Sequence, residues 1–156
     1  VTVTDQNLCD TIISYNILEP LEIVIDTNVI NSSCFGSCSG QAYITAVGGT
    51  GSYTFEWFDA NTGLALGVNN DSITNLCPGD YYAQITDAAL CQVNSDTMTI
   101  TELPEIFTQV ITEGDATCGV CDGNAEVLAT GGTGAFTYIW TPAPGAGQGT
   151  AIATGP

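Results

Sequence analysis

Residues 48–57 read GGTGSYTFEW, and residues 131–140 read GGTGAFTYIW. The start of the chain keeps the same register, because residues 17–23 (ILEPLEI) match residues 100–106 (ITELPEI). The period is about 83 residues, which is the size of a small domain. Self-similarity at a fixed period is typical of repeat arrays, so we expect a string of like domains rather than one large domain.

The register divides the chain into one complete repeat and two partial ones. We expect residues 1–19 to be the C-terminal part of a preceding repeat and residues 20–103 to be complete. Residues 104–156 then form the N-terminal part of a following repeat. The junctions are short and carry proline, which predicts a semi-rigid array.

Strand signals dominate within each repeat. Ala42, Ile44 and Ala46 alternate with polar residues, as do their repeat partners, and this period of two predicts half-buried strands from about residue 21 to about residue 101. With six or seven short strands per repeat, we predict an all-β fold of tandem immunoglobulin-like β-sandwiches. Val1 and Val3 are expected to point inward. The predicted aromatic core consists of Tyr53, Phe55, Trp57, Tyr81, Phe136, Tyr138 and Trp140.

The chain has no cationic side chain. It has no Lys, Arg or His against 17 acidic residues, which gives a formal net charge of −17. Binding to nucleic acid or to anionic membranes is excluded, because no side chain can displace phosphate counterions. An enzyme is not expected, since acid–base and anion-binding side chains are absent. A carboxylate pair that hydrolyses glycosides would need a cleft, which a narrow sandwich rarely offers.

The motifs together resemble the SprB-type repeat of Bacteroidetes. They are the Gly-Gly-Thr-Gly-x-aromatic-Thr-aromatic-x-Trp run, the Leu-x-x-Gly-x-Tyr corner of residues 76–81, and the Thr-Asp-x-x-x-Cys turn of residues 86–91. The resemblance implies a secreted, surface-exposed or filamentous protein, exported by the type IX system, whose repeats have no enzymatic role. The extra cysteine pair, Cys38 and Cys77, departs from many such repeats.

Seven cysteines in a chain rich in Thr, Gly and Asn indicate an oxidising, extracellular setting. Cys77 and Cys91 flank a strand of roughly 30 Å, so they cannot bond to each other. We favour a Cys38–Cys77 disulfide, with Cys34–Cys38 as the rival, and the partner of Cys91 stays open. A structural disulfide is favoured over zinc or redox function for the pair Cys118 and Cys121.

Two further kinds of site are candidates. Acidic loops with Asp59, Asn61 and Asp71 offer oxygen ligands for calcium, although the full spacing of a dedicated calcium loop is absent. Three Asp-Ser/Thr-apolar tripeptides resemble the O-glycosylation acceptors of the same bacteria, at Thr11, Ser72 and Thr97.

The leading functional hypothesis is a stalk or spacer segment of a large secreted cell-surface adhesin, used in adhesion or gliding motility. Its partners are then the neighbouring repeats. The first alternative is a module that binds glycans or proteins by avidity. The second is a subunit of an extracellular filament, in which copies of the chain associate through sheet edges. No cofactor other than calcium is expected.

Overall fold

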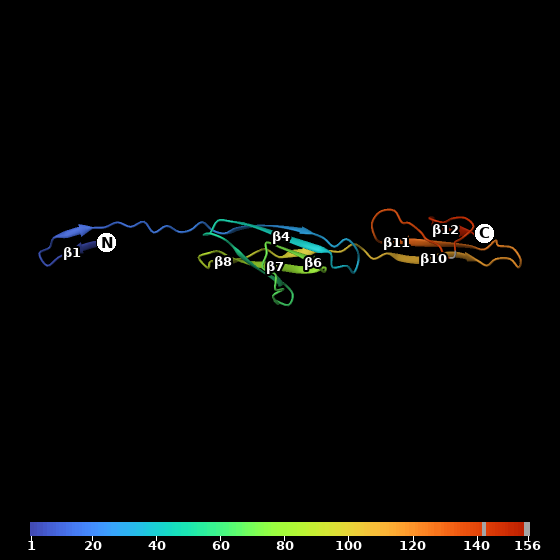
Figure 1. Cartoon of the computed structure of the whole chain (residues 1–156), viewed down its shortest axis with the longest axis horizontal. Coiled ribbons are helices and arrows are strands. Elements are labelled where there is room, and N and C mark those ends of the chain that lie inside the picture. Colours follow the sequence, from blue (N-terminus) through green and yellow to red (C-terminus); the bar gives the residue numbers. More distant parts are fainter. Residues whose placement is uncertain (142, 155–156) are drawn as a thin grey trace.

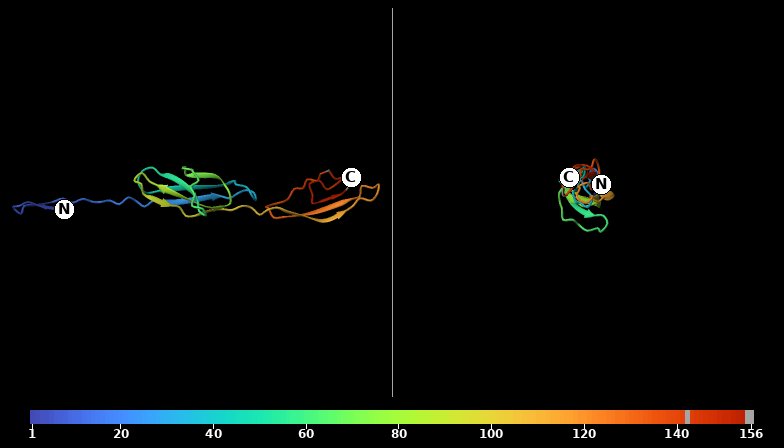
Figure 2. Two further views of the ribbon diagram at one scale, coloured as in Figure 1. Left: turned by 90° about the horizontal axis from the view of Figure 1, so that it is seen from below. Right: turned by 90° about the vertical axis from the view of Figure 1, so that its right-hand side faces the viewer.

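The computed structural model describes residues 1–141 and 143–154, and these residues form β-strands but no helix. The all-β expectation is therefore confirmed. A thin N-terminal ribbon, a central domain and a C-terminal sheet follow one another along the long axis of the molecule (Figures 1 and 2). Within the described residues, the structure has no helix that is long and apolar enough to span a membrane.

The central domain is a sandwich of two antiparallel sheets. One sheet has the order β3-β4-β6, and the other has the order β5-β7-β8 with β9 also paired to β7. Strand β9 contacts β3 and β4 as well, so it joins the two sheets. The strands are β3 (Val24–Ile30), β4 (Gly40–Val47), β5 (Thr54–Asp59), β6 (Ser72–Leu76), β7 (Gly79–Thr86), β8 (Gln92–Asn94) and β9 (Met98–Ile100). The immunoglobulin-like class stays a prediction.

The core lies between these sheets and follows the alternation of the sequence. Trp57 and Ile85 have no exposed surface, and Ile100 is 1 % exposed. Tyr53 and Phe55 are partly buried and pack against this cluster. A side-chain period of two places one face of each strand inside, and this is why the aromatic run on β5 belongs to the core.

Two polar groups of the core aromatics are satisfied by backbone carbonyls. The Trp57 indole Nε1–H donates to the carbonyl oxygen of Asn70 at 2.8 Å. The Tyr81 hydroxyl donates to the carbonyl oxygen of Cys77 at 2.9 Å, which is the bond that a tyrosine corner makes. Burial, helped by the charge of Asp59, raises the pKa of Tyr81 above its ordinary value.

The last strand of the repeat differs from the expectation. The sequence predicts one strand over about residues 92–101, whereas the structure has β8 and β9 with a break at residues 95–97. At the break, Ser95 N–H donates to the carbonyl oxygen of Ala83 at 2.8 Å, and the Ala83 N–H donates to Ser95 Oγ at 3.0 Å. The serine hydroxyl thus replaces a backbone acceptor, and the ladder is interrupted.

The C-terminal part repeats the first sheet of the central domain. Its strands are β10 (Phe107–Gly114), β11 (Asn124–Thr130) and β12 (Ile152–Thr154), in the order β10-β11-β12. Phe107 pairs with Thr130 as Val24 pairs with Val47.

The predicted core stripe of this part is not formed. Phe136, Tyr138 and Trp140 alternate with exposed residues, but they are only half-buried and lie outside any strand. In the central domain the matching stripe lies on β5, which pairs with β7. The counterpart of β7 would fall beyond Pro156, so these aromatics have no strand to pair with in this chain.

The N-terminal part is a two-stranded ribbon of β1 (Thr2–Thr4) and β2 (Asp10–Ile12). The expectation that Val1 and Val3 point inward is wrong, since they are 80 % and 55 % exposed. A single ribbon has no second sheet against which to bury a face.

Candidate functional site

One end of the central domain is closed by a disulfide between Cys38 and Cys77, which are 39 residues apart in the sequence. Cys38 lies in the loop between β3 and β4, and Cys77 lies at the corner before β7. Cys34, in the same loop as Cys38, is an exposed free thiol. The remaining cysteines of the described chain are also exposed and free, namely Cys9, Cys91, Cys118 and Cys121.

The opposite end of the domain is organised by Asp87, which is only 3 % exposed. Its Oδ1 accepts hydrogen bonds from the N–H groups of Ala89 at 2.9 Å and Cys91 at 2.8 Å. Its Oδ2 accepts from the N–H and the hydroxyl of Thr50, at 2.9 and 3.0 Å. Asp87 therefore ties the turn before β8 to the Gly-Gly-Thr-Gly turn before β5.

These bonds set the ionisation of Asp87. Burial opposes the charged form, but hydrogen bonds from Thr50, Cys91 and Ala89 outweigh it and hold the pKa of Asp87 below its ordinary value. Asp5, the repeat partner of Asp87, accepts from Asn7 and Cys9 in the same way but is exposed. The contact between Thr50 and Asp87 was not predicted from the sequence. Its signal is in the sequence, since Thr50 recurs as Thr133 and Asp87 recurs as Asp5.

The Gly-Gly-Thr-Gly turn touches the segment that enters the domain. Gly49 N–H donates to the carbonyl oxygen of Leu21 at 2.7 Å. Gly48 has a φ of +90°, and a Cβ there would collide with the carbonyl oxygen of Glu22. Glycine is needed at position 48 for both its conformation and the close approach of two backbones.

The segment between the central domain and the C-terminal part is bonded on both sides. On the central side, Thr101 N–H donates to Asn31 Oδ1 at 3.0 Å, and Glu102 Oε2 accepts from Gly36 N–H at 2.5 Å. On the other side, Gly132 N–H donates to the carbonyl oxygen of Pro104 at 3.1 Å. The junction is thus a packed structure and not a free tether.

Each junction contains a groove. One side of each groove, called the floor below, is formed by equivalent residues of the repeat. The groove after the central domain is about 390 Å³, has its floor at residues 103–106 and Gly132, and is walled by residues 33–35 with Cys34. The groove before the central domain is about 300 Å³, has its floor at residues 19–23 and Gly49, and is walled by Asp87 and residues 91–93 with Cys91. The two floors are repeat counterparts.

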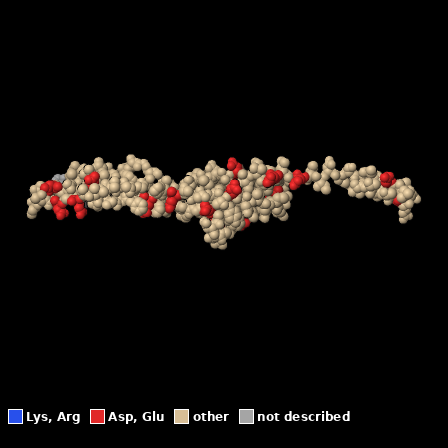
Figure 3. Space-filling model, turned by 180° about the vertical axis from the view of Figure 1, so that it is seen from behind, with Lys and Arg blue, Asp and Glu red and all other residues tan. Residues whose placement is uncertain are grey.

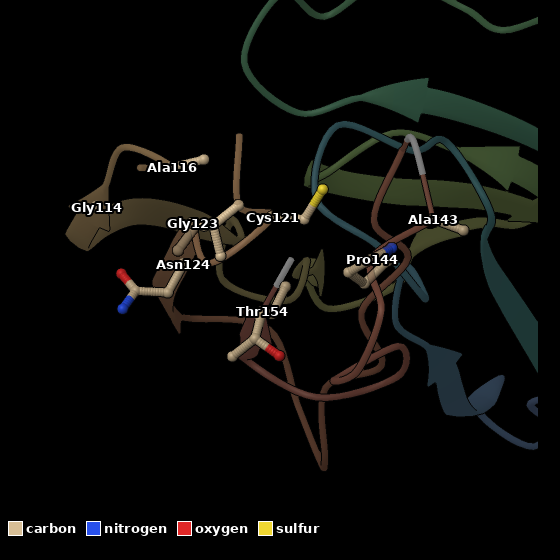
Figure 4. A pocket seen from close by; sticks show the side chains of 11 residues that line it. Gly114, Ala116, Cys121, Gly123, Asn124, Ala143, Pro144 and Thr154 are labelled. Atoms are coloured by element: carbon tan, nitrogen blue, oxygen red, sulfur yellow. The ribbon is translucent and has the colours of Figure 1, made fainter. Parts of the chain in front are cut away.

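A third hollow, of about 570 Å³, lies in the C-terminal part between the β10–β11 loop, β12 and residues 143–144 (Figure 4). Cys121 and Gly123 line it, and their repeat counterparts are Cys38 and Gly40. In the central domain, Cys38 is bonded to Cys77, and a Cβ on Gly40 would meet Ile100. The hollow therefore corresponds to space that Ile100 and the disulfide occupy in the central domain.

The candidate calcium residues are engaged locally. Asp59 Oδ1 accepts from the N–H groups of Asn61 and Thr62 at 2.9 and 2.8 Å, and these bonds lower the pKa of Asp59. The Oδ1 of Asp71 accepts a hydrogen bond from the Ser72 hydroxyl at 3.3 Å. Over residues 1–141 and 143–154, no three His, Cys, Asp or Glu side chains are grouped as a metal site. Calcium binding stays a prediction.

The candidate glycan acceptors lie on or near strands. Thr11 on β2 and Thr97 before β9 are exposed, and Ser72 at the start of β6 is half-buried. Glycosylation stays a prediction at all three. Acidic side chains are scattered over the visible face without any cation between them (Figure 3).

The geometry defines a class of protein: a β-sandwich domain that is repeated along a chain, with polar contacts concentrated at its two ends. Residues 27–62, from β3 to the turn after β5, match the family model of the SprB repeat. This part of the chain is therefore similar to a SprB repeat, a family associated with Bacteroidetes cell-surface adhesins. No curated protein and no solved structure matches the chain.

Proposed function

We propose that this segment is a stiff spacer that holds a more distal part of a surface adhesin away from the cell, for adhesion or gliding motility. The observation that carries the proposal is the bonded junction. Residues 101–104 are held by Asn31 and Gly36 on one side and by Gly132 on the other. A linker that is bonded to both neighbours transmits the direction of one repeat to the next, as a spacer requires.

The surface supports a passive role. The described chain presents no cationic side chain that could hold an anionic substrate, and the hollow of about 570 Å³ in the C-terminal part corresponds to a position that is filled in the central domain. We therefore propose that the segment catalyses no reaction, and that its principal partners are the neighbouring repeats. Secretion, glycosylation and the mode of attachment to the outer membrane or a filament belong to the same proposal and follow from the family resemblance.

Small-angle X-ray scattering on arrays of one to four copies of residues 20–102, which is one full period, tests the stiffness. A spacer predicts that the maximum dimension grows by a constant increment per copy. A flexible string predicts growth close to the square root of the copy number. Growth with the square root of the copy number would contradict the spacer role. A maximum dimension that changes with protein concentration, which indicates self-association, would also contradict it.

A further inference from the structure

Cys34 and Cys91 lie at opposite ends of one repeat, and neither has a partner within it. Cys34 is in the β3–β4 loop, at the end closed by the Cys38–Cys77 bond. Cys91 follows β7, whose eight residues span about 27 Å from the corner that holds Cys77. A disulfide needs Cα atoms within roughly 7 Å, so these two thiols cannot meet inside one repeat.

The repeat relation brings them together between repeats. The groove after the central domain has the Cys34 wall, and the groove before it has the Cys91 wall. Both grooves are built on the same floor, since Glu22, Ile23 and Gly49 in one correspond to Glu105, Ile106 and Gly132 in the other. At a junction between two complete repeats, the equivalent floor residues would be lined by Cys34 of the first repeat and by the Cys91 counterpart of the second, which brings the two thiols to one groove.

We propose that Cys34 of one repeat forms a disulfide with the counterpart of Cys91 in the following repeat, so that each junction is covalently stapled. Two observations support it independently of the groove. Both thiols are exposed at the surface, so an oxidant in solution can reach them. Cys38, four residues from Cys34, is already oxidised in the same loop, so the repeat is built for an oxidising environment.

The bond forms by thiol–disulfide exchange with a small-molecule or protein disulfide as oxidant. The thiolate of one cysteine attacks the oxidant disulfide and releases one reduced thiol. The second cysteine then attacks the mixed disulfide and releases the other thiol. Two protein S–H groups are lost and one S–S bond is made. The two electrons and two protons end on the two thiols of the reduced oxidant.

A staple at each junction has a mechanical consequence. The backbone passes through the junction along residues 101–106, and the disulfide would add a second covalent connection between adjacent repeats. Tension along the chain would then be shared between two paths. The proposal goes beyond the spacer role and does not depend on it, because it rests on repeat geometry and on the state of the thiols alone.

The test uses two copies of residues 20–102 in tandem, because Leu103 is the repeat counterpart of Pro20 and already begins the next repeat. This unit contains the whole core cluster from Ile23 to Ile100, as well as the Cys38–Cys77 bond, so it folds as one domain. The junction-pair variant carries Cys91→Ser in the first copy and Cys34→Ser in the second, and keeps the two thiols that face the junction. The outer-pair control carries Cys34→Ser in the first copy and Cys91→Ser in the second, and keeps the two thiols at the far ends.

Both variants are oxidised with oxidised glutathione at low protein concentration. The monomeric fraction with buried Trp57 fluorescence is then alkylated and its intact mass is measured. We expect the junction-pair variant to take up no alkyl group and to give a cross-linked peptide containing Cys34 and Cys91, whereas the outer-pair control takes up two alkyl groups or carries two bound glutathiones. Equal modification of the two folded variants would overturn the proposal.

Discussion

Removal of the Cys38–Cys77 disulfide should be the most damaging change to the central domain that leaves its core side chains intact. The bond joins the β3–β4 loop of one sheet to the corner before β7 of the other. In the variant Cys38→Ser/Cys77→Ser, the folded state loses a link between the two sheets. The unfolded state gains the freedom of an open loop of 39 residues.

The loop length sets the magnitude. In the chain-entropy treatment, closing a loop of this size removes about 13 cal/mol/K from the unfolded state, which is about 4 kcal/mol at 25 °C. Small domains have a total stability of about 5–15 kcal/mol, so the variant loses a large share of it. With a urea dependence of about 1.2 kcal/mol/M, the midpoint of unfolding should fall by roughly 3 M.

The assay is urea unfolding followed by the fluorescence of Trp57, which is fully buried, in a Trp140→Phe background that removes the second tryptophan. The matched control is Cys34→Ser/Cys91→Ser, which removes two exposed free thiols and should leave the midpoint unchanged. If the bond variant does not fold, reduction of the unmutated domain with dithiothreitol gives the same comparison. A loss below about 1 kcal/mol would refute the argument that loop closure stabilises the domain.

Three other perturbations have defined outcomes. Because folding lowers the pKa of Asp87, its charge stabilises the folded state at pH values above the ordinary pKa of 3.8, and this contribution disappears as pH falls through the lower pKa of the folded state. The melting temperature of Asp87→Asn should thus lie below that of the unmutated chain at pH 7, and the difference between the two melting temperatures should become smaller below pH 3.8. A difference that stays constant with pH would contradict this. Gly48→Ala should lower the free energy of unfolding by clearly more than Gly63→Ala, for which we expect a loss of roughly 1–2 kcal/mol. Both glycines have positive φ, but of the two only a Cβ at position 48 would meet a backbone oxygen. Equal losses in urea unfolding would contradict this collision. The melting temperature should rise with NaCl, and more steeply with calcium, because 17 acidic residues repel without any cation; a flat or falling curve in calorimetry contradicts it.

Much of the central domain could be predicted from the sequence, because its signals are local. The alternation of Ala42 and Ile44 marks a strand whose inner face is buried, and the structure buries both residues. The aromatic run that ends at Trp57 lies on β5 as expected. The Cys34–Cys38 loop and the Cys77 corner lie at one end because β4 and β6 are antiparallel neighbours with Gly40 opposite Leu76, and the topology expected of a sandwich predicts this placement.

Burial in the partial repeats could not be predicted from local pattern. Ile17 and Ile100 occupy the same repeat position, yet Ile17 is 97 % exposed and Ile100 is 1 % exposed. The difference is supplied by partners far away in sequence. Ile100 lies on β9, which pairs with β7 and contacts β3 and β4, and the corresponding strands have no counterpart before Ile17 in this chain. A periodic pattern fixes which face of a strand is apolar, but burial requires a second sheet.

The Gly-Gly-Thr-Gly turn makes contacts inside the domain and also with the segment that enters from the preceding repeat. One short sequence therefore marks both the domain and its place in the array. Within the repeat, Thr50 binds the carboxylate of Asp87 and so joins the ends of β4 and β7. At the start of each repeat, Gly49 N–H donates to the carbonyl oxygen of Leu21, as Gly132 N–H donates to that of Pro104, and this fixes the segment that enters from the preceding repeat. The contacts use backbone N–H groups, carbonyls and one buried carboxylate, and none is an ion pair. Screening of charge by salt therefore weakens repulsion among the surface acids without weakening the junction. The junction contacts of such a spacer should therefore persist as salt rises, whereas a junction held by salt bridges would loosen.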